Sequence, residues 1–246
     1  MMKILALAAA RGMRAAAVAG LLLPAACGDL PTGPGPVGGP LPGIDVSHWQ
    51  GGIDWDAVAD DGVQFAFIKA TEGGDYTDPR FAANWAAARQ AGVLRGAYHF
   101  FRPQTDAMAQ AAHFLRTVQL APGDLPPVLD VEVTDGRSLD AVAAGVRTWL
   151  QEVERATGRR PIVYTRASFW TAQMGGGFGG YPLWVAHYGV AAPNIPSGWS
   201  GWTFWQYSDA GRMDRIAGDV DLDWFNGDRD ALDAFIATGA LSAAAR

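Results

Sequence analysis

The run Leu125-Pro126-Pro127-Val128-Leu129-Asp130-Val131-Glu132-Val133 carries the most information about this chain. Its apolar residues, entered through two prolines, predict a buried strand. Strand side chains alternate between faces, so Asp130 and Glu132 point the same way, roughly 6.6 Å apart from two steps of strand rise. Carboxylates at that spacing repel, and one can be held protonated at neutral pH. The pair is typical of acid catalysis, although two solvated acids at an exposed strand end would look the same.

Short apolar runs alternate with helical patterns around this strand. Further strands are expected at 43–47, 64–70, 94–100, 161–165, 182–188, 202–207 and 220–223, and helices at 78–90, 106–118, 139–156 and 228–237. Eight strands with helices mainly in the first half predict an α/β fold, a modified TIM-like βα barrel with fewer helices in its second half. An open doubly wound sheet is the alternative.

The predicted strands share a feature at their carboxyl ends, where the loops of a barrel build the active site. Side chains suited to chemistry or binding lie at or near those ends: Asp45, Lys69, Tyr98, Asp130, Glu132, Tyr188, Gln206 and Asp221. If the strands form a barrel, these side chains converge on one pocket. Such convergence argues against the alternative in which Asp130 and Glu132 are two solvated acids at an exposed strand end.

Composition limits the possible partners. The 246 residues carry a net charge of −6, which argues against nucleic acid. Ten tryptophans supply flat apolar faces that suit sugar rings or a protein core. The four histidines show no metal-ligand spacing, and no metal or cofactor is expected. The glycine-rich run 175–180 satisfies G-x-G-x-x-G but is followed by Tyr181-Pro182 rather than a helix, so we interpret it as a loop.

The first 27 residues have the pattern of an export signal. Positive residues precede an uncharged apolar run at 15–23, and small residues follow it. Translation could start at Met1 or Met13. Cys27 is the only cysteine, and its place resembles a bacterial lipoprotein processing site, so we expect lipidation there and a location at the cell envelope. Plain secretion with an incidental cysteine is the alternative. Residues 28–42 form a Gly/Pro-rich tether, and the catalytic domain is expected at 43–246.

Seven runs occur in the order and spacing of a known family: Gly43-Ile44-Asp45-Val46-Ser47-His48-Trp49-Gln50-Gly51, Phe67-Ile68-Lys69-Ala70-Thr71-Glu72-Gly73, Gly96-Ala97-Tyr98-His99-Phe100, Asp130-Val131-Glu132, Trp184-Val185-Ala186-His187-Tyr188, Trp205-Gln206-Tyr207-Ser208 and Val220-Asp221-Leu222-Asp223. The chain from Gly43 to Phe235 thereby resembles glycoside hydrolase family 25, the Chalaropsis-type lysozymes. The resemblance implies a modified barrel that cuts peptidoglycan between N-acetylmuramic acid and N-acetylglucosamine. We expect it to act as a monomer on glycan strands.

The resemblance also implies roles for individual residues. Glu132 matches the general acid, Asp130 its partner, and Asp45 the acid that ends the first strand. Asp221 matches the acid of the last strand, with Asp219 and Asp223 as neighbouring candidates. Side chains expected to bind the sugar are Tyr98, Trp184, Tyr188, Trp205, Gln206 and Lys69.

In this mechanism Glu132 protonates the glycosidic oxygen, and burial and repulsion from Asp130 and Asp45 are expected to keep it neutral. The spacing of the pair lies between the carboxyl separations of retaining and inverting enzymes. A third route, attack by the 2-acetamido carbonyl of the substrate with Asp130 holding its N–H, is the one we favour. A chitinase-like hydrolase and a wall-binding module without turnover are the alternative functions.

Overall fold

The computed structural model of the chain describes residues 39–238. Its sheet has the strand order β1-β9-β8-β7-β6-β5-β4-β2-β3, and it closes because β1 also pairs with β2. The strands are β1 (Leu41–Val46), β2 (Phe65–Glu72), β3 (Tyr76–Thr77), β4 (Leu94–Phe100), β5 (Val128–Asp130), β6 (Ile162–Arg166), β7 (Leu183–Ala186), β8 (Phe204–Gly211) and β9 (Val220–Phe225). Eight of these strands form the ring, and β3 lies outside it as a hairpin on β2. The predicted barrel is confirmed, and the open sheet is excluded by the β1–β2 pairing.

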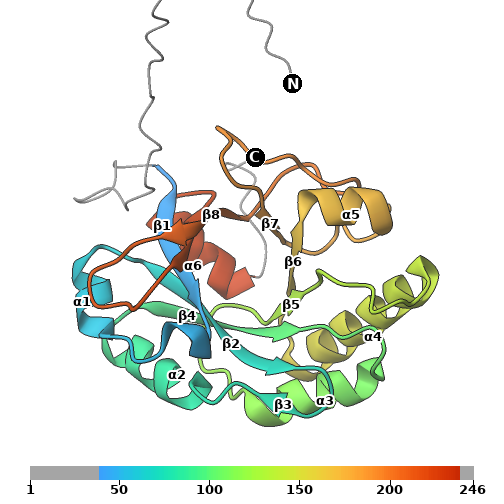
Figure 1. Ribbon diagram of the computed structural model, residues 1–246, viewed down its shortest axis with the longest axis horizontal. Coiled ribbons are helices and arrows are strands. Elements are labelled where there is room, and N and C mark those ends of the chain that lie inside the picture. Colours follow the sequence, from blue (N-terminus) through green and yellow to red (C-terminus); the bar gives the residue numbers. More distant parts are fainter. Residues whose placement is uncertain (1–38, 239–246) are drawn as a thin grey trace, which may run out of the picture.

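Helices cover the first half of the barrel more completely than the second (Figure 1). They are η1 (His48–Gln50, a 3-10 turn), α1 (Trp55–Asp60), α2 (Phe81–Gln90), α3 (Ala107–Thr117), α4 (Leu139–Thr157), α5 (Ala167–Gln173) and α6 (Arg229–Thr238). No helix joins β7 to β8 or β8 to β9, as the thinning pattern predicted. The short elements η1, α1, α5 and β3 were not predicted, because so few residues carry little periodicity.

Helix α4 shows how local sequence sets an element. The Ser138 hydroxyl accepts a hydrogen bond from the backbone N–H of Ala141 and caps the amino end. Gly158 ends the helix in the left-handed conformation, at φ 68°. Apolar residues at helical spacing, among them Trp149, are buried against the neighbouring elements. The helix thereby holds the outer side of the barrel beside α3.

Strand β9 departs from the regular barrel, because it runs antiparallel to both β1 and β8. Asp221 therefore lies near the beginning of its strand and not, as we predicted, near its carboxyl end. It pairs in register with Asp45 of β1. The reversed direction brings Asp221 to the same rim as the carboxyl ends of the parallel strands.

The barrel interior below that rim is filled with aromatic side chains. Phe65 and Phe67 of β2 cross the interior, and Phe67 stacks on Trp184 with ring centroids 4.3 Å apart. Their rings fit because the facing positions are glycines: a Cβ on Gly43 would lie 2.3 Å from the Phe65 ring, and one on Gly96 would lie 2.6 Å from the Phe67 ring. Leu232 and Phe235 of α6 pack against the same cluster. The interior is thus a packed core and not a channel.

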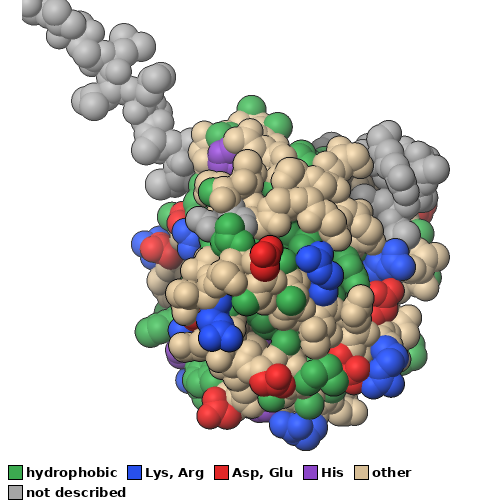
Figure 2. Space-filling model, turned by 90° about the vertical axis from the view of Figure 1, so that its right-hand side faces the viewer, with side chains coloured by type: hydrophobic (Ala, Val, Ile, Leu, Met, Phe, Trp, Pro, Cys, Tyr) green, Lys and Arg blue, Asp and Glu red, His purple; other side chains and the backbone are tan. Residues whose placement is uncertain are grey.

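The face of the molecule shown in Figure 2 carries acidic and basic side chains interspersed with scattered hydrophobic ones. Over residues 39–238, no helix is long and apolar enough to cross a membrane. The predicted export signal, Cys27, the tether up to residue 38 and the last eight residues of the predicted domain, 239–246, lie outside the described residues.

Candidate active site

A cleft of about 320 Å³ lies at the barrel rim where the parallel strands end. It is lined by Asp45, Val46, Ser47, Trp49, Gln50, Lys69, Tyr98, Phe100, Asp130, Glu132, Tyr164, Arg166, Trp184, Tyr188, Gln206 and Asp221. These residues belong to or directly follow all eight strands of the ring. A barrel of this kind builds its binding site at this rim.

The four acids singled out in the sequence lie together in this cleft. Asp45 comes from β1, Asp130 from β5 and Asp221 from β9. Strand β5 is shorter than predicted and ends at Asp130, so Glu132 lies in the loop that follows. Glu132 nevertheless lines the cleft beside Asp130, as expected of residues two positions apart.

Asp45 is held in a buried setting at the centre of the site. Burial, followed by repulsion from Asp221 and Asp223, raises its pKa well above the usual value. Its Oδ2 accepts a hydrogen bond of 2.6 Å from Nε2 of Gln206. The Oε1 atom of Gln206 accepts hydrogen bonds from the hydroxyls of Tyr164, at 2.8 Å, and Tyr188, at 2.6 Å. Gln206 thus ties the tyrosines to the acid.

Asp221 and Asp223 differ in what they face. Burial and, next, the charge of Asp209 raise the pKa of Asp221 to about 6. Asp223 is fully buried and accepts a hydrogen bond of 2.8 Å from the indole N–H of Trp184. Because Asp221 lines the cleft and Asp223 lies behind it, Asp221 is the member of the pair available to a ligand.

At the end of β5, the fold increases the proton affinity of Asp130. Burial and the neighbouring charge of Glu132 raise its pKa well above the usual value, while Lys69 acts in the opposite direction. Its buried Oδ1 has no hydrogen-bond partner among the described residues. Because Asp130 lines the cleft, this unpaired carboxyl oxygen can form a hydrogen bond with a ligand.

Glu132 is paired with an arginine that the sequence analysis missed. Nε and Nη2 of Arg166 lie 3.4 Å and 3.2 Å from its two carboxyl oxygens. Burial raises the pKa of Asp130, and the guanidinium balances the charge of Glu132. That Glu132 is the neutral acid of the pair stays a prediction. Strand alternation could have identified Arg166 as a residue of the site, because Ile162 and Tyr164 of β6 face inward and Arg166 is next in that series.

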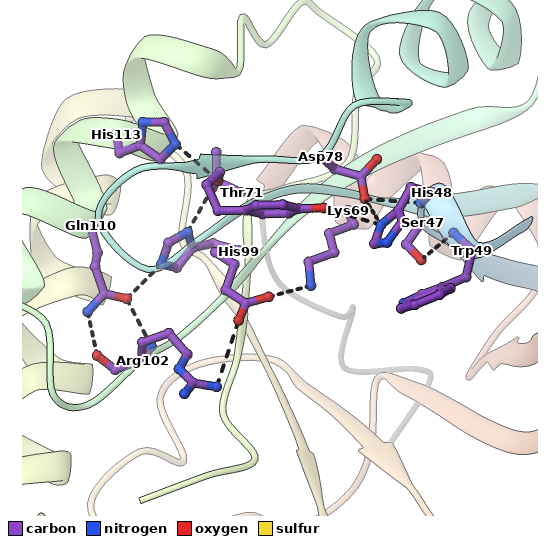
Figure 3. Close-up of polar contacts among 12 residues, drawn as sticks. Ser47, His48, Trp49, Lys69, Thr71, Asp78, His99, Arg102, Gln110 and His113 are labelled. Carbon is purple, nitrogen blue, oxygen red and sulfur yellow. Dashed lines mark hydrogen bonds and ion pairs between the residues drawn. The ribbon is translucent and has the colours of Figure 1, made fainter. Parts of the chain in front are cut away.

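Most residues predicted to bind sugar lie in the cleft: Tyr98, Trp184, Tyr188, Gln206 and Lys69. Trp184 is 2% exposed, so it forms the floor and not an open face. Nζ of Lys69 lies 2.7 Å from Glu72, which Arg102 approaches from the other side at 3.7 Å (Figure 3). Lys69 is thus paired with Glu72 and not directly with the four acids.

Trp205 does not line the cleft. It directly precedes the inward-facing Gln206, and adjacent side chains in a strand point to opposite faces. Its indole N–H donates to the backbone oxygen of His187, and its ring packs with Trp202 outside the barrel. The expectation that Trp205 contacts sugar is therefore corrected: it supports the loop that follows β7.

Two histidines that we set aside have partners of other kinds. His99 is buried between Thr71 and Gln110, and burial lowers its pKa to about 3 (Figure 3). His48 contacts the buried Asp78. Across residues 39–238, no three or more His, Cys, Asp or Glu side chains are grouped so as to hold a metal ion.

Comparisons with known proteins identify the family of the chain. The family model described as glycosyl hydrolases family 25 matches residues 44–216. The chain is 48% identical over 199 residues to the uncharacterized protein YegX of Escherichia coli K12, covering 79% of this chain and 72% of that protein. It is 45% identical over 198 residues to lysozyme M1 of Streptomyces globisporus, covering 75% and 67%.

A solved structure shares the fold as well as the sequence. The crystal structure of the bacterial lysozyme from Streptomyces coelicolor superposes with a TM-score of 0.72 and 41% identity, covering 80% of this chain and 96% of that one. The family match spans well over half of the chain. The chain therefore belongs to glycosyl hydrolase family 25 and is a glycoside hydrolase.

Proposed function

We propose that this protein is an N-acetylmuramidase, which cleaves the β-1,4 bond between N-acetylmuramic acid and N-acetylglucosamine in peptidoglycan. The convergence of Asp45, Asp130, Glu132 and Asp221 in one cleft of a family 25 barrel is the observation that carries the proposal. Glycoside hydrolysis needs an acid for the leaving oxygen and a group that attacks or activates attack at the anomeric carbon, which is a second carboxyl group or the substrate's own acetamido group. The name of lysozyme M1, a relative, supports the choice of substrate.

Asp130 and Glu132 act in this proposal as a pair that shares one proton. In the free enzyme the buried Asp130 holds it, and Arg166 balances Glu132. When a sugar enters, Glu132 leaves Arg166, takes up the proton and delivers it to the glycosidic oxygen. Asp130, now ionised, accepts the N–H of the substrate's 2-acetamido group, whose carbonyl attacks the anomeric carbon. Water then opens the intermediate with Glu132 as base.

The remaining residues of the cleft are assigned supporting roles. Asp221, whose pKa is about 6, is ionised at neutral pH and stabilises positive charge that develops at the anomeric carbon. Asp45 accepts the hydrogen bond of Gln206 and so positions that amide in the cleft. Tyr98, Tyr188 and Gln206 contact the bound sugar, and Trp184 forms the floor beneath it. Lys69 lies at the edge of the site, where its pairing with Glu72 holds the ammonium group and its charge lowers the pKa of Asp130.

Mass spectrometry of digested peptidoglycan tests the reaction itself. The expected products end in a reducing N-acetylmuramic acid. Products with a reducing N-acetylglucosamine, or intact glycan with cleaved peptides, would contradict the proposal. Proton NMR of the first-formed anomer tests the mechanism, because attack by the acetamido group retains the β configuration, and a first-formed α anomer would reject it.

We further propose that the chain is exported and acts at the cell envelope as a monomer, anchored through lipid on Cys27. The apolar run and the small residues before Cys27 support this, together with the extracellular substrate. Acyl groups would hold the Gly/Pro tether and the barrel near the membrane. Mass spectrometry of the mature protein tests it: a diacylglyceryl group on Cys27 is expected, absent from Cys27→Ser, and an unmodified mature chain would reject the anchor.

A further inference from the structure

An exposed aromatic surface borders the cleft where β1 and β2 end. Trp49 on η1 is 80% exposed, and Tyr76 on the β2–β3 hairpin is 38% exposed. His48 lies between them, with ring centroids 4.6 Å from Trp49 and 6.3 Å from Tyr76. We call these three side chains the rim strip. Single exposed apolar residues are ordinary on proteins, but gathered aromatic faces beside a cleft mark binding surfaces.

The turn that carries Trp49 is held in a defined shape. The Ser47 hydroxyl accepts from the backbone N–H of Trp49 at 3.3 Å, and Oε1 of Gln50 accepts from the backbone N–H of Ser47 at 2.9 Å. Nε2 of Gln50 donates to the backbone oxygen of Asp219, which ties the turn to the approach to β9. Gly51 then leaves the turn at φ 65°. No residue of η1 is buried, so the turn is not fixed by packing its side chains into the core.

A buried carboxylate holds the middle of the strip. Asp78 is 2% exposed, and its Oδ2 accepts from the backbone N–H of His48 at 3.0 Å and lies 2.8 Å from Nδ1 of the same residue (Figure 3). The hydroxyl of Tyr76 is 3.4 Å from that Nδ1. The other oxygen of Asp78 accepts from the backbone N–H of Arg80 at 2.8 Å. Burying a carboxylate costs free energy that these hydrogen bonds offset, and the result is an oriented imidazole beneath an exposed indole.

The strip lies across the barrel mouth from Arg166. In the ring order, β1 and β6 are separated by four steps in either direction, so the residues after them occupy opposite sides of the rim. Trp49 and Arg166 both line the cleft. A chain of sugars that crosses the cleft from a scissile bond at Glu132 would reach Trp49 on the opposite side of the rim.

We propose that the rim strip is a distal subsite, in which the apolar face of a pyranose ring of a β-1,4-linked N-acetylhexosamine strand stacks on Trp49. This inference rests on the proposed function for the identity of the strand. Trp49 provides a flat apolar face with one polar atom, which matches the C–H face and the hydroxyl edge of such a ring. Asp78 holds His48, whose ring contacts the indole of Trp49, and this contact reduces the conformational entropy that the indole loses when a sugar binds.

The test compares a long glycan strand with the shortest oligosaccharide that the protein cleaves. Trp49→Ala is expected to lower the ratio of kcat/KM for the long substrate to that for the short one by about tenfold, mainly through KM. His48→Ala, at the positioning residue, should lower the same ratio by roughly threefold. Met108→Ala is the matched control, because Met108 is 47% exposed on α3 and does not line the cleft.

An unchanged ratio for Trp49→Ala overturns the inference. An equal loss on both substrates with a lowered unfolding temperature also overturns it, since that result describes a structural residue. If the wild-type chain cleaves neither substrate, the proposed function fails separately. Isothermal titration of the same two glycans then decides, with weaker binding of only the long one by Trp49→Ala as the supporting result.

Discussion

The floor and the rim of this barrel are built by the same strands but have opposite chemistry. On β2 the inward series runs from Phe67 to Lys69, and on β5 from Val128 to Asp130. Inward-facing residues recur every second position, so an advance of two residues along a strand leads from the packed apolar layer to the charged groups. The carboxyls rest on an apolar floor, and their burial there is the first cause of the raised pKa of Asp45 and Asp130. The floor therefore contributes stability and also sets the chemistry of the rim.

Glu132→Gln is expected to have the largest effect, because it should abolish most of the turnover at the rim while leaving the stability of the floor unchanged. The amide keeps the shape of the side chain but cannot deliver a proton, so turnover of peptidoglycan should fall by about 10²–10⁴. The unfolding temperature should stay close to that of the wild type, because Glu132 lies above the packed floor. Glu152→Gln on α4 is the matched control with unchanged turnover. Retained activity in Glu132→Gln would reject the assignment of the acid.

Phe67→Ala makes the complementary change in the floor. Phe67 is fully buried and stacks on Trp184, so its removal leaves a cavity and should lower the free energy of unfolding by about 3–5 kcal/mol. Urea unfolding measures this loss. Phe67→Leu should lose much less, since most of the volume remains. Equal stability of the alanine variant and the wild type would show that the floor does not support the barrel.

Gly96→Ala tests the fit of the same ring from the opposite side. The added Cβ would lie 2.6 Å from the Phe67 ring and 3.1 Å from the Cβ of Leu125, and the overpacking should lower stability by about 1–3 kcal/mol. Gly180→Ala is the control, because nothing lies within 4 Å of its added Cβ. Combining Gly96→Ala with Phe67→Leu should recover part of the loss. No recovery would mean that the clash is not with Phe67.

Asp221→Asn tests how burial at the apolar floor changes the pKa of an acid at the rim, through the pH dependence of stability. The folded protein raises the pKa of Asp221 to about 6, so between about pH 4 and pH 6 it binds more protons than the unfolded chain. The contribution of Asp221 to the free energy of unfolding therefore falls as pH rises through that window and remains low above it. The asparagine variant should gain about 2 kcal/mol relative to the wild type on going from pH 4 to pH 7. Asp219→Asn, at an exposed acid, should not; an equal gain there would point to net charge instead.

Several features of the site were predictable because they depend on position along a strand. The barrel followed from eight apolar runs with helices concentrated in the first half, and the rim positions of Asp45 and Asp130 followed from their places at the ends of parallel strands. Alternation could also have been applied more strictly. Trp205 and Gln206 are adjacent and cannot both face the cleft, and Arg166 continues the inward series of β6.

Other features depended on contacts between distant segments. The sequence places Asp78 at the start of a helix, whereas the structure buries it beneath His48, thirty residues away, and begins α2 at Phe81. Lys69 pairs with Glu72, three residues further along β2, where the pairing of β2 with β4 shifts register between Lys69 and Thr71; that irregularity had no signal in the pattern. The hydrophobic periodicity of the sequence does not predict such partners, because they depend on the paths that the loops take at the rim.

Local rules of strand alternation, helix capping and residue type were enough to determine from the sequence that this chain forms a βα barrel with an acidic mouth. Tertiary structure alone decided which acids are buried, which tryptophans line the cleft, and that β9 runs antiparallel to its neighbours and brings Asp221 beside Asp45. The physical reason is that proton affinity and exposure depend on the charges and apolar surface that surround a group in space. Those neighbours come from other strands, and the chain order does not contain their distances.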